Sequence, residues 1–215
     1  MESAQASGTA AEASTSDGVA SRRGRPVEVQ PDQVALAALR LFDERGYAAV
    51  SMDDVARATG VSRRTVFRYF PRKADLVWSG AAEAQTDIRA ALAETPDNAS
   101  TIDAVRAAYA RALDFPMEQW EATRRRLLLI QGHPALYETV RGQLDEQRAL
   151  LLSFIAEREG LAPGSLRAHV LTDALSAASF SALVWWASAG DERPPAEVVD
   201  AALAELQKAF SAPGS

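Results

Sequence analysis

The sequence predicts an all-α protein. From Pro31 onward, apolar residues recur at the three- and four-residue spacing that lets a helix bury one face. The segments that carry this spacing are bounded by Ser, Thr or Pro at their starts and by Gly or Pro at their ends, as helices are. About nine helices can be traced in this way.

The first three helices are short and closely connected. Residues 31–47 suit a helix, because Pro31 favours a first helical turn and Gly46 favours an end. Ser51 with Asp54 resembles a capping box that begins a helix over 52–59, which Gly60 ends. Ser62 can cap a third helix over 63–70, which Pro71 stops. Two short helices joined by a Gly-containing turn form the helix-turn-helix pattern, whose second helix enters the DNA major groove.

The third helix is expected to be apolar inside and basic outside. An inward stripe is formed by Val55, Val61, Val66 and Phe70. The outward side chains are those of Arg63, Arg64, Thr65, Arg68 and Tyr69. Residues 21–75 hold 11 basic and 7 acidic residues, a net of +4, whereas residues 76–215 hold 12 and 19, a net of −7. A basic head on an acidic body favours an encounter with a polyanion. The alternative is a solvated basic face.

The rest of the chain reads as six more helices. A long helix over 72–95 should connect to a second domain, followed by helices over 101–115, 118–131, 134–159, 165–189 and 195–210. No run is expected to span a membrane, since Asp173 and several Ser and Thr residues interrupt the most apolar one, 169–189. We therefore expect a disordered tail with a basic arm over 1–26, a helix-turn-helix domain over 27–75 and a second helical domain over 76–215.

The run from Ala38 to Leu76 resembles the N-terminal domain of the TetR family of bacterial transcriptional regulators. The resemblance is carried by "F…GY", "VA…TGVS", "TVFRYF" and "K…L" in that order. It implies a three-helix DNA-binding domain and a C-terminal ligand-binding and dimerisation domain, in a homodimer of about nine helices per chain. Such a protein binds double-stranded palindromic operator DNA, by default as a repressor, and releases it when a small-molecule effector binds.

The resemblance also assigns DNA contacts. Arg63, Arg64 and Thr65 would approach base edges, with Phe67 and Arg68 one turn further on, and Arg side chains favour guanine. Tyr69 and Lys73 match phosphate-contacting positions, and Ser51 and Ser62 complete the expected interface. Phe67 replaces a tyrosine common in the family, so it contacts a thymine methyl or simply packs. The tail adds Arg22, Arg23 and Arg25, which can follow phosphates or enter the minor groove, or can serve only as a solubilising tail.

A narrower resemblance concerns the second domain. "RRTVFRYFPRKADLVW", "RRRLLLIQ…PAL" and "FIAEREG" are similar to TetR-type proteins of the mycofactocin-regulator group, which implies an acyl-CoA-like effector, such as a long-chain acyl-CoA. One of the adjacent Arg124, Arg125 and Arg126 could meet its phosphates. The candidate ligand-binding residues are Trp78, Phe115, Trp120, Arg124, Leu127, Leu128, Tyr137, Leu144, Leu151, Phe154, Phe180, Trp185 and Trp186. The first alternative is that these residues form hydrophobic core. The second is that they bind an aromatic or multidrug-like ligand, in which case the three adjacent Arg side chains would only face solvent.

The helix over 165–189 is rich in Ala and Ser, which allows close helix approach. In the family the last two helices form the dimer interface. The residues suited to it are Leu171, Leu175, Ala178, Ala182, Val198, Leu203 and Leu206. The alternative for each is intramolecular core.

Enzyme chemistry finds no support in the sequence. Cys is absent, His133 and His169 lie far apart without carboxylates at metal-ligand spacing, and neither a phosphate loop nor a nucleophile elbow occurs. We expect no catalytic residues, no cofactor, no metal and a cytoplasmic location. The competing class is a helical lipid- or protein-binding module without sequence-specific DNA binding.

Overall fold

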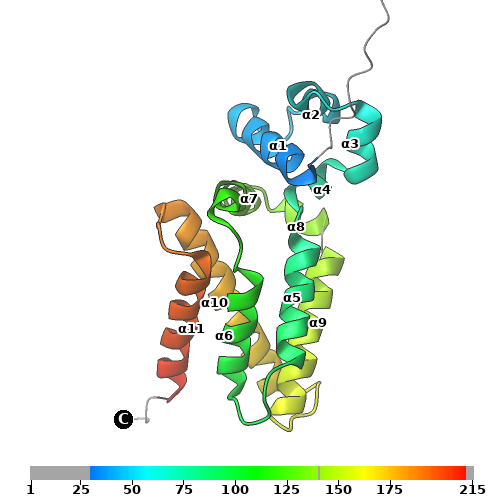
Figure 1. Ribbon diagram of the computed structural model, residues 1–215. Coiled ribbons are helices and arrows are strands. Elements are labelled where there is room, and N and C mark those ends of the chain that lie inside the picture. The colour runs from blue at the N-terminus through cyan, green and yellow to red at the C-terminus, as the bar shows by residue number, and fades with distance from the viewer. Residues whose placement is uncertain (1–29, 140, 212–215) are drawn as a thin grey trace, which may run out of the picture.

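The computed structural model describes residues 30–139 and 141–211, which form eleven α-helices and one 3-10 turn, with no strand among them. The predicted all-α class is confirmed. The arm residues Arg22, Arg23 and Arg25 lie outside the described residues. In Figure 1 the helices α1–α4 form an upper unit, α7 lies across its base, and the longer helices run downward from there.

The upper unit is built from four helices, whose bounds are α1 (Pro31–Arg45), α2 (Met52–Thr59), α3 (Arg63–Tyr69) and α4 (Lys73–Val77). The predicted inward stripe is confirmed, since Val55, Val66 and Phe70 are buried and Val61 packs against them. Leu39 and Phe42 of α1 complete this core.

The lower unit contains the remaining helices, which are α5 (Ala81–Ala93), α6 (Thr101–Ala112), α7 (Trp120–Gly132, after a 3-10 turn over Met117–Gln119), α8 (Ala135–Thr139), α9 (Arg141–Arg158), α10 (Leu166–Ala189) and α11 (Pro195–Ser211). Its core includes Ile88, Val105, Ile155 and Trp186.

One of the nine expected helices is divided. The segment 72–95 breaks between α4 and α5, where Gly80 has a φ of 85°, a left-handed conformation that suits glycine. Of the expected helix over 134–159, the structure describes α8 and α9, which lie on either side of residue 140.

Four of the expected dimer residues face the chain's own core, which corrects the sequence-based assignment. Side chains Leu175, Ala182, Val198 and Leu203 are at most 7% exposed, and Leu171, Ala178 and Leu206 pack partly buried against the same cluster. Buried side chains offer no surface to a second copy. The intramolecular alternative therefore holds for the four buried residues.

The outward face of α10 carries large apolar side chains, beside Asp173, which pairs with Arg148. Leu166 is 80% exposed, and Val170 and Trp185 are each 51% exposed. By length and composition, Leu166–Ala189 could cross a membrane, with 33% of its most apolar window buried. The core helix of a protein that does not enter a membrane passes the same test, so this finding does not overturn the expectation that no run spans a membrane.

The helix α7 belongs to both cores. Its residue Leu127 packs in the lower cluster, whereas Leu129 and Ile130, together with Leu136 of α8, pack among α1–α4. The upper core thus extends beyond the predicted boundary at residue 75 and depends on residues more than fifty positions later in the chain.

Candidate nucleic-acid interface and effector domain

The turn between α2 and α3 is fixed by capping bonds. Ser51 Oγ accepts a hydrogen bond from the Asp54 N–H at 3.2 Å, and the Asp54 carboxylate accepts one from the Ser51 N–H at 2.9 Å. The Asp54 carboxylate also accepts hydrogen bonds from the Ser51 hydroxyl at 2.5 Å and from Arg57, and the bonds from the Ser51 hydroxyl, the Ser51 N–H and Arg57 lower its pKa to about 2. Gly60 takes a left-handed conformation with φ of 68°, and the Thr65 N–H donates to Ser62 Oγ. Both expected DNA-contacting serines are therefore N-caps, Ser51 of α2 and Ser62 of α3.

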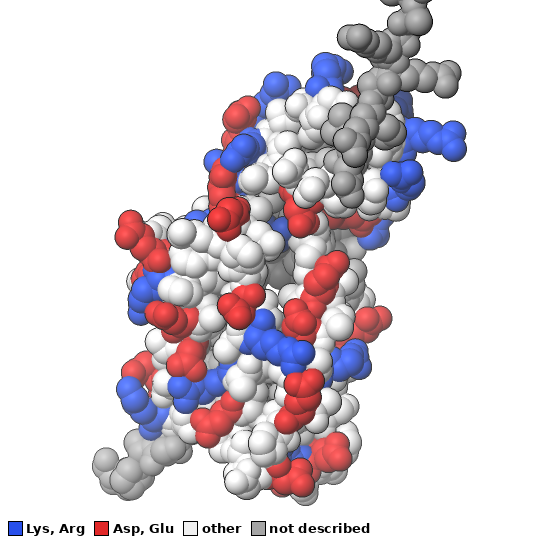
Figure 2. All heavy atoms as spheres, viewed as in Figure 1, with Lys and Arg blue, Asp and Glu red and all other residues white. Residues whose placement is uncertain are grey.

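The outward face of α3 is exposed as expected. Arg63, Arg64 and Arg68 lie on the surface, Phe67 is 37% exposed and Tyr69 is 42% exposed. Basic side chains gather around the rim of the upper unit in Figure 2, while acidic ones are spread over the lower body. The structure thus brings a basic and aromatic surface together on one short helix.

Several of these side chains are held in place. The Arg63 guanidinium bonds to Asp53 at 3.0 Å and lies 5.3 Å from the centroid of Phe67. Arg68 donates to the Tyr69 hydroxyl at 3.2 Å and lies 4.8 Å from its ring centroid. Sequence reasoning missed Asp53, because its partner is on another helix.

Lys73 has a structural role. Its Nζ donates to the carbonyls of Tyr47 and Val50 at 2.6 and 2.9 Å and lies 4.2 Å from the centroid of the Tyr47 ring. Burial lowers the pKa of this ammonium. Both hydrogen bonds join the start of α4 to the turn after α1, so the side chain expected to contact phosphate stabilises its own domain.

The three adjacent Arg residues of α7 also have internal partners. Arg124 donates to the carbonyl of Trp186 at 2.7 Å and to that of Asp191, with its guanidinium 3.8 Å from the Trp186 ring centroid. Arg126 donates to the Val77 carbonyl at 2.6 Å, and burial lowers its pKa to about 10. These bonds hold Arg124 and Arg126 within the chain, and an anion contact by one of the three Arg residues stays a prediction.

Arg125 completes an ion network between α7 and α1. Glu121 accepts two hydrogen bonds from Arg40 at 2.8 and 2.6 Å and one from Arg125 at 3.0 Å, while Arg125 also pairs with Asp43. The bonds from Arg40 are the largest cause of the lowering of the Glu121 pKa to about 2. The network ties the upper unit to the lower one across about eighty residues of sequence.

The expected ligand-binding residues are not brought together in one cavity. Trp120 and Leu127 pack in or against the lower core, with Leu151, Phe154 and Trp186, and Trp78 packs against the upper core. Phe115 and Leu144 are partly buried, Leu128 is 40% exposed, and Tyr137 lies in α8 without a described side chain. The indole N–H groups of Trp78 and Trp120 are buried without a hydrogen-bond partner among the described residues.

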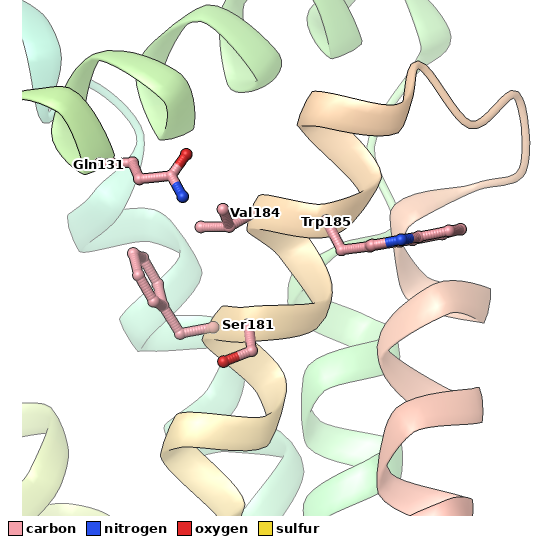
Figure 3. Close-up of a pocket in the computed structure, with 5 residues that line it drawn as sticks. Gln131, Ser181, Val184 and Trp185 are labelled. Carbon is pink, nitrogen blue, oxygen red and sulfur yellow. The ribbon is translucent and has the colours of Figure 1, made fainter.

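Phe180 and Trp185 instead line an open hollow on the surface between α7 and α10. Its volume is about 360 Å³, and its other lining residues are Gln131, Ser181 and Val184. Figure 3 shows Gln131 reaching from α7 toward Val184, whereas Trp185 leaves α10 on another side. The hollow is continuous with the exposed apolar face of α10. Among the residues that the structure describes, no cluster of His, Asp or Glu could hold a metal ion.

Comparisons with known proteins agree with this arrangement. Residues 36–78 match the family described as bacterial regulatory proteins, tetR family, and residues 99–211 match the MftR C-terminal domain. One relative is the mycofactocin biosynthesis transcriptional regulator MftR of Mycobacterium tuberculosis. The two sequences are 30% identical over 140 residues, which cover 65% of this chain and 71% of that protein.

Solved structures share the fold. FadR from Bacillus halodurans superposes with a TM-score of 0.57 at 16% identity, covering 86% of this chain and all of that one. The Thermus thermophilus repressor FadR, solved with lauroyl-CoA, gives 0.52 at 20% identity with the same coverage. From these matches and its helix-turn-helix, the chain belongs to the TetR family of ligand-responsive, DNA-binding transcriptional regulators.

Proposed function

We propose that this protein is a homodimeric repressor that binds a palindromic operator through α3 and is released by a small, largely apolar effector. The observation that carries the proposal is the exposed basic face of α3, a helix that Ser62 caps directly after the turn from α2. Arg64 is exposed, and among the described residues its side chain has no hydrogen bond or ion pair, so its guanidinium is available to bases or phosphates. This role places the protein in the cytoplasm and requires no catalysis.

Binding assays with promoter DNA test the first part. The protein should bind a palindromic duplex from its own promoter region more tightly than random DNA at physiological salt. Arg64→Ala should lower this preference, because a good Arg–guanine pair discriminates by about 1–3 kcal/mol. Equal affinity for promoter and random DNA would refute specific repression and favour a module that uses its basic patch only for acidic surfaces.

The second copy of the chain is proposed to cover the outward face of α10. Large apolar side chains of a folded protein are normally buried. Yet Leu166, Val170 and Trp185 remain at least half exposed. A second α10 related by two-fold symmetry would bury the same face on both chains, and the Ala and Ser residues of this helix permit close approach.

An acyl chain is the effector that we favour, on the match to the MftR C-terminal domain and the apolar lower core. The cations of the lower unit limit how a coenzyme A moiety could be held. Most of these cations already have partners. Arg106 pairs with Asp200, Arg148 pairs with Asp173, and Arg158 donates to two backbone carbonyls. Arg89 is exposed and, among the side chains described in the lower unit, has no such partner.

Release of operator DNA by a panel of ligands tests the effector. Lauroyl-CoA, the free fatty acid and coenzyme A alone separate the contribution of the chain from that of the phosphates. We expect release and a thermal shift with lauroyl-CoA but not with coenzyme A. If none of the acyl compounds shifts the melting temperature, an acyl effector is wrong, and aromatic compounds become the class to test.

A further inference from the structure

An acidic side chain lies on the DNA-facing surface. Asp53 is in the first turn of α2, is exposed, and forms an ion pair with Arg63, in which its Oδ1 lies 3.0 Å from Arg63 Nε. Its neighbours Asp54 and Asp75 are explained by the fold, because each accepts a backbone N–H in a capping arrangement. Asp53 makes no such capping bond. A negative charge beside a phosphate-binding surface repels DNA and weakens binding. The presence of Asp53 on this surface therefore calls for an explanation.

The ion pair between Asp53 and Arg63 supplies this explanation. One side of the guanidinium is bonded through Nε to Asp53, and the Phe67 ring lies 5.3 Å from its central carbon. The terminal Nη1 and Nη2 atoms remain outside this bond. These are the two donors that can pair end-on with O6 and N7 of guanine. A long side chain fixed in advance by a neighbouring acid loses less freedom when it binds.

We propose that Asp53 is a positioning and specificity-determining residue, which holds Arg63 for guanine and lowers binding to other sequences through its own charge. The proposal rests on the proposed placement of α3 in the major groove. The Asp53 and Arg63 side chains are 49% and 68% exposed. An ion pair this exposed contributes little to folding, so the role that we assign to it is in recognition.

The proposal predicts opposite effects on specific and non-specific binding. Asp53→Asn and Asp53→Ala should bind random duplex a few-fold more tightly, because a repulsive charge is gone. Their operator-to-random affinity ratio should fall about five- to ten-fold, at the lower end of what one Arg–guanine pair provides. Arg63→Ala should lower the same ratio, and the Asp53→Ala, Arg63→Ala double variant should lower it no further.

A matched control separates charge from position. Glu44 is an exposed acid at the end of α1 that has no side-chain hydrogen bond or ion pair within 30–139 and 141–211, so Glu44→Gln removes one negative charge from the same domain without changing a partner of Arg63. We expect its affinity ratio to stay within two-fold of wild type. Fluorescence anisotropy with operator, random duplex and operator containing 7-deazaguanine, which lacks N7, gives the ratios, and melting temperatures confirm that all variants fold.

The outcomes are distinguishable. If Arg63→Ala lowers the ratio but both Asp53 variants keep it within two-fold, Asp53 does not position Arg63 and the inference is wrong. If Arg63→Ala itself leaves the ratio unchanged, the placement of α3 on DNA is wrong at this residue and the inference fails with it. If Glu44→Gln lowers the ratio as much as Asp53→Asn, general charge explains the effect and the inference is overturned.

Discussion

Replacing Glu121 by Gln should weaken the attachment of the DNA-binding head to the body. Glu121 accepts three hydrogen bonds from Arg40 and Arg125, and these pairs join α1 to α7. The substitution keeps the size of the side chain but removes its charge. We therefore expect a loss of stability without a change in helix content.

The magnitude follows from the exposure of the network. A shift of the Glu121 pKa from 4.5 to about 2 would correspond to about 3 kcal/mol if it were fully converted into stability. The side chain is 41% exposed, and that of Arg40 is 51% exposed, so solvent screening reduces this value. Exposed pairs contribute about 0.2–1 kcal/mol each, and two pairs give about 1 kcal/mol. In a chain of this size that corresponds to a melting temperature lower by about 2–4 °C.

The pH dependence has a definite sign. The folded pKa of Glu121 lies below its ordinary value of 4.5. Its contribution is therefore complete above pH 4.5 and is lost as the pH falls toward 2. The stability difference between wild type and Glu121→Gln should shrink over this interval.

A double-mutant cycle measures the interaction itself. Urea unfolding of wild type, Arg40→Gln, Glu121→Gln and the double variant gives the coupling energy, first at low salt and then at 1 M salt, where screening should reduce it. A coupling below about 0.2 kcal/mol at low salt, which is the lower limit for exposed pairs, would refute the role of the network. So would a stability difference that stays constant down to pH 2.

Three further outcomes are expected. Lys73→Met should lower the free energy of unfolding by about 2 kcal/mol, because two hydrogen bonds from a charged group are lost. An unchanged melting temperature, together with weaker binding to all DNA sequences alike, would instead support a phosphate contact. Val66→Ala, at a side chain only 1% exposed, should cost about 2 kcal/mol through lost burial and a cavity, and circular dichroism melting that matches wild type would contradict the core assignment. Val170→Glu should give a monomer by light scattering, and an unchanged dimer mass would show that the second copy binds elsewhere.

Local signals made the helix-turn-helix predictable from sequence. Ser51, Asp54, Gly60 and Ser62 act within three residues of their partners, so their spacing alone indicates the caps that the structure contains. The inward stripe is equally local, because Val66 and Phe70 share one face of a single helix.

The roles of the α7 arginines could not be read in the same way. Each guanidinium bonds to a different part of the chain, at Trp186, Asp43 and Val77, and sequence spacing does not reveal such partners. The same limit applies to α10. Its composition indicates a helix that packs closely, but apolar side chains on several faces do not show which face meets the chain's own core and which remains outside.

The packing of α7 in two hydrophobic clusters bears on how regulators of this kind can be recombined. A chimera that exchanged only residues 27–75 with a relative would keep foreign side chains at Leu129, Ile130 and Leu136 beneath the new head. The incoming DNA-binding domain would then pack against side chains that fit a different domain. Exchange of operator preference should therefore be attempted by grafting the surface of α3 alone, or by transferring the head together with the second half of α7 and α8.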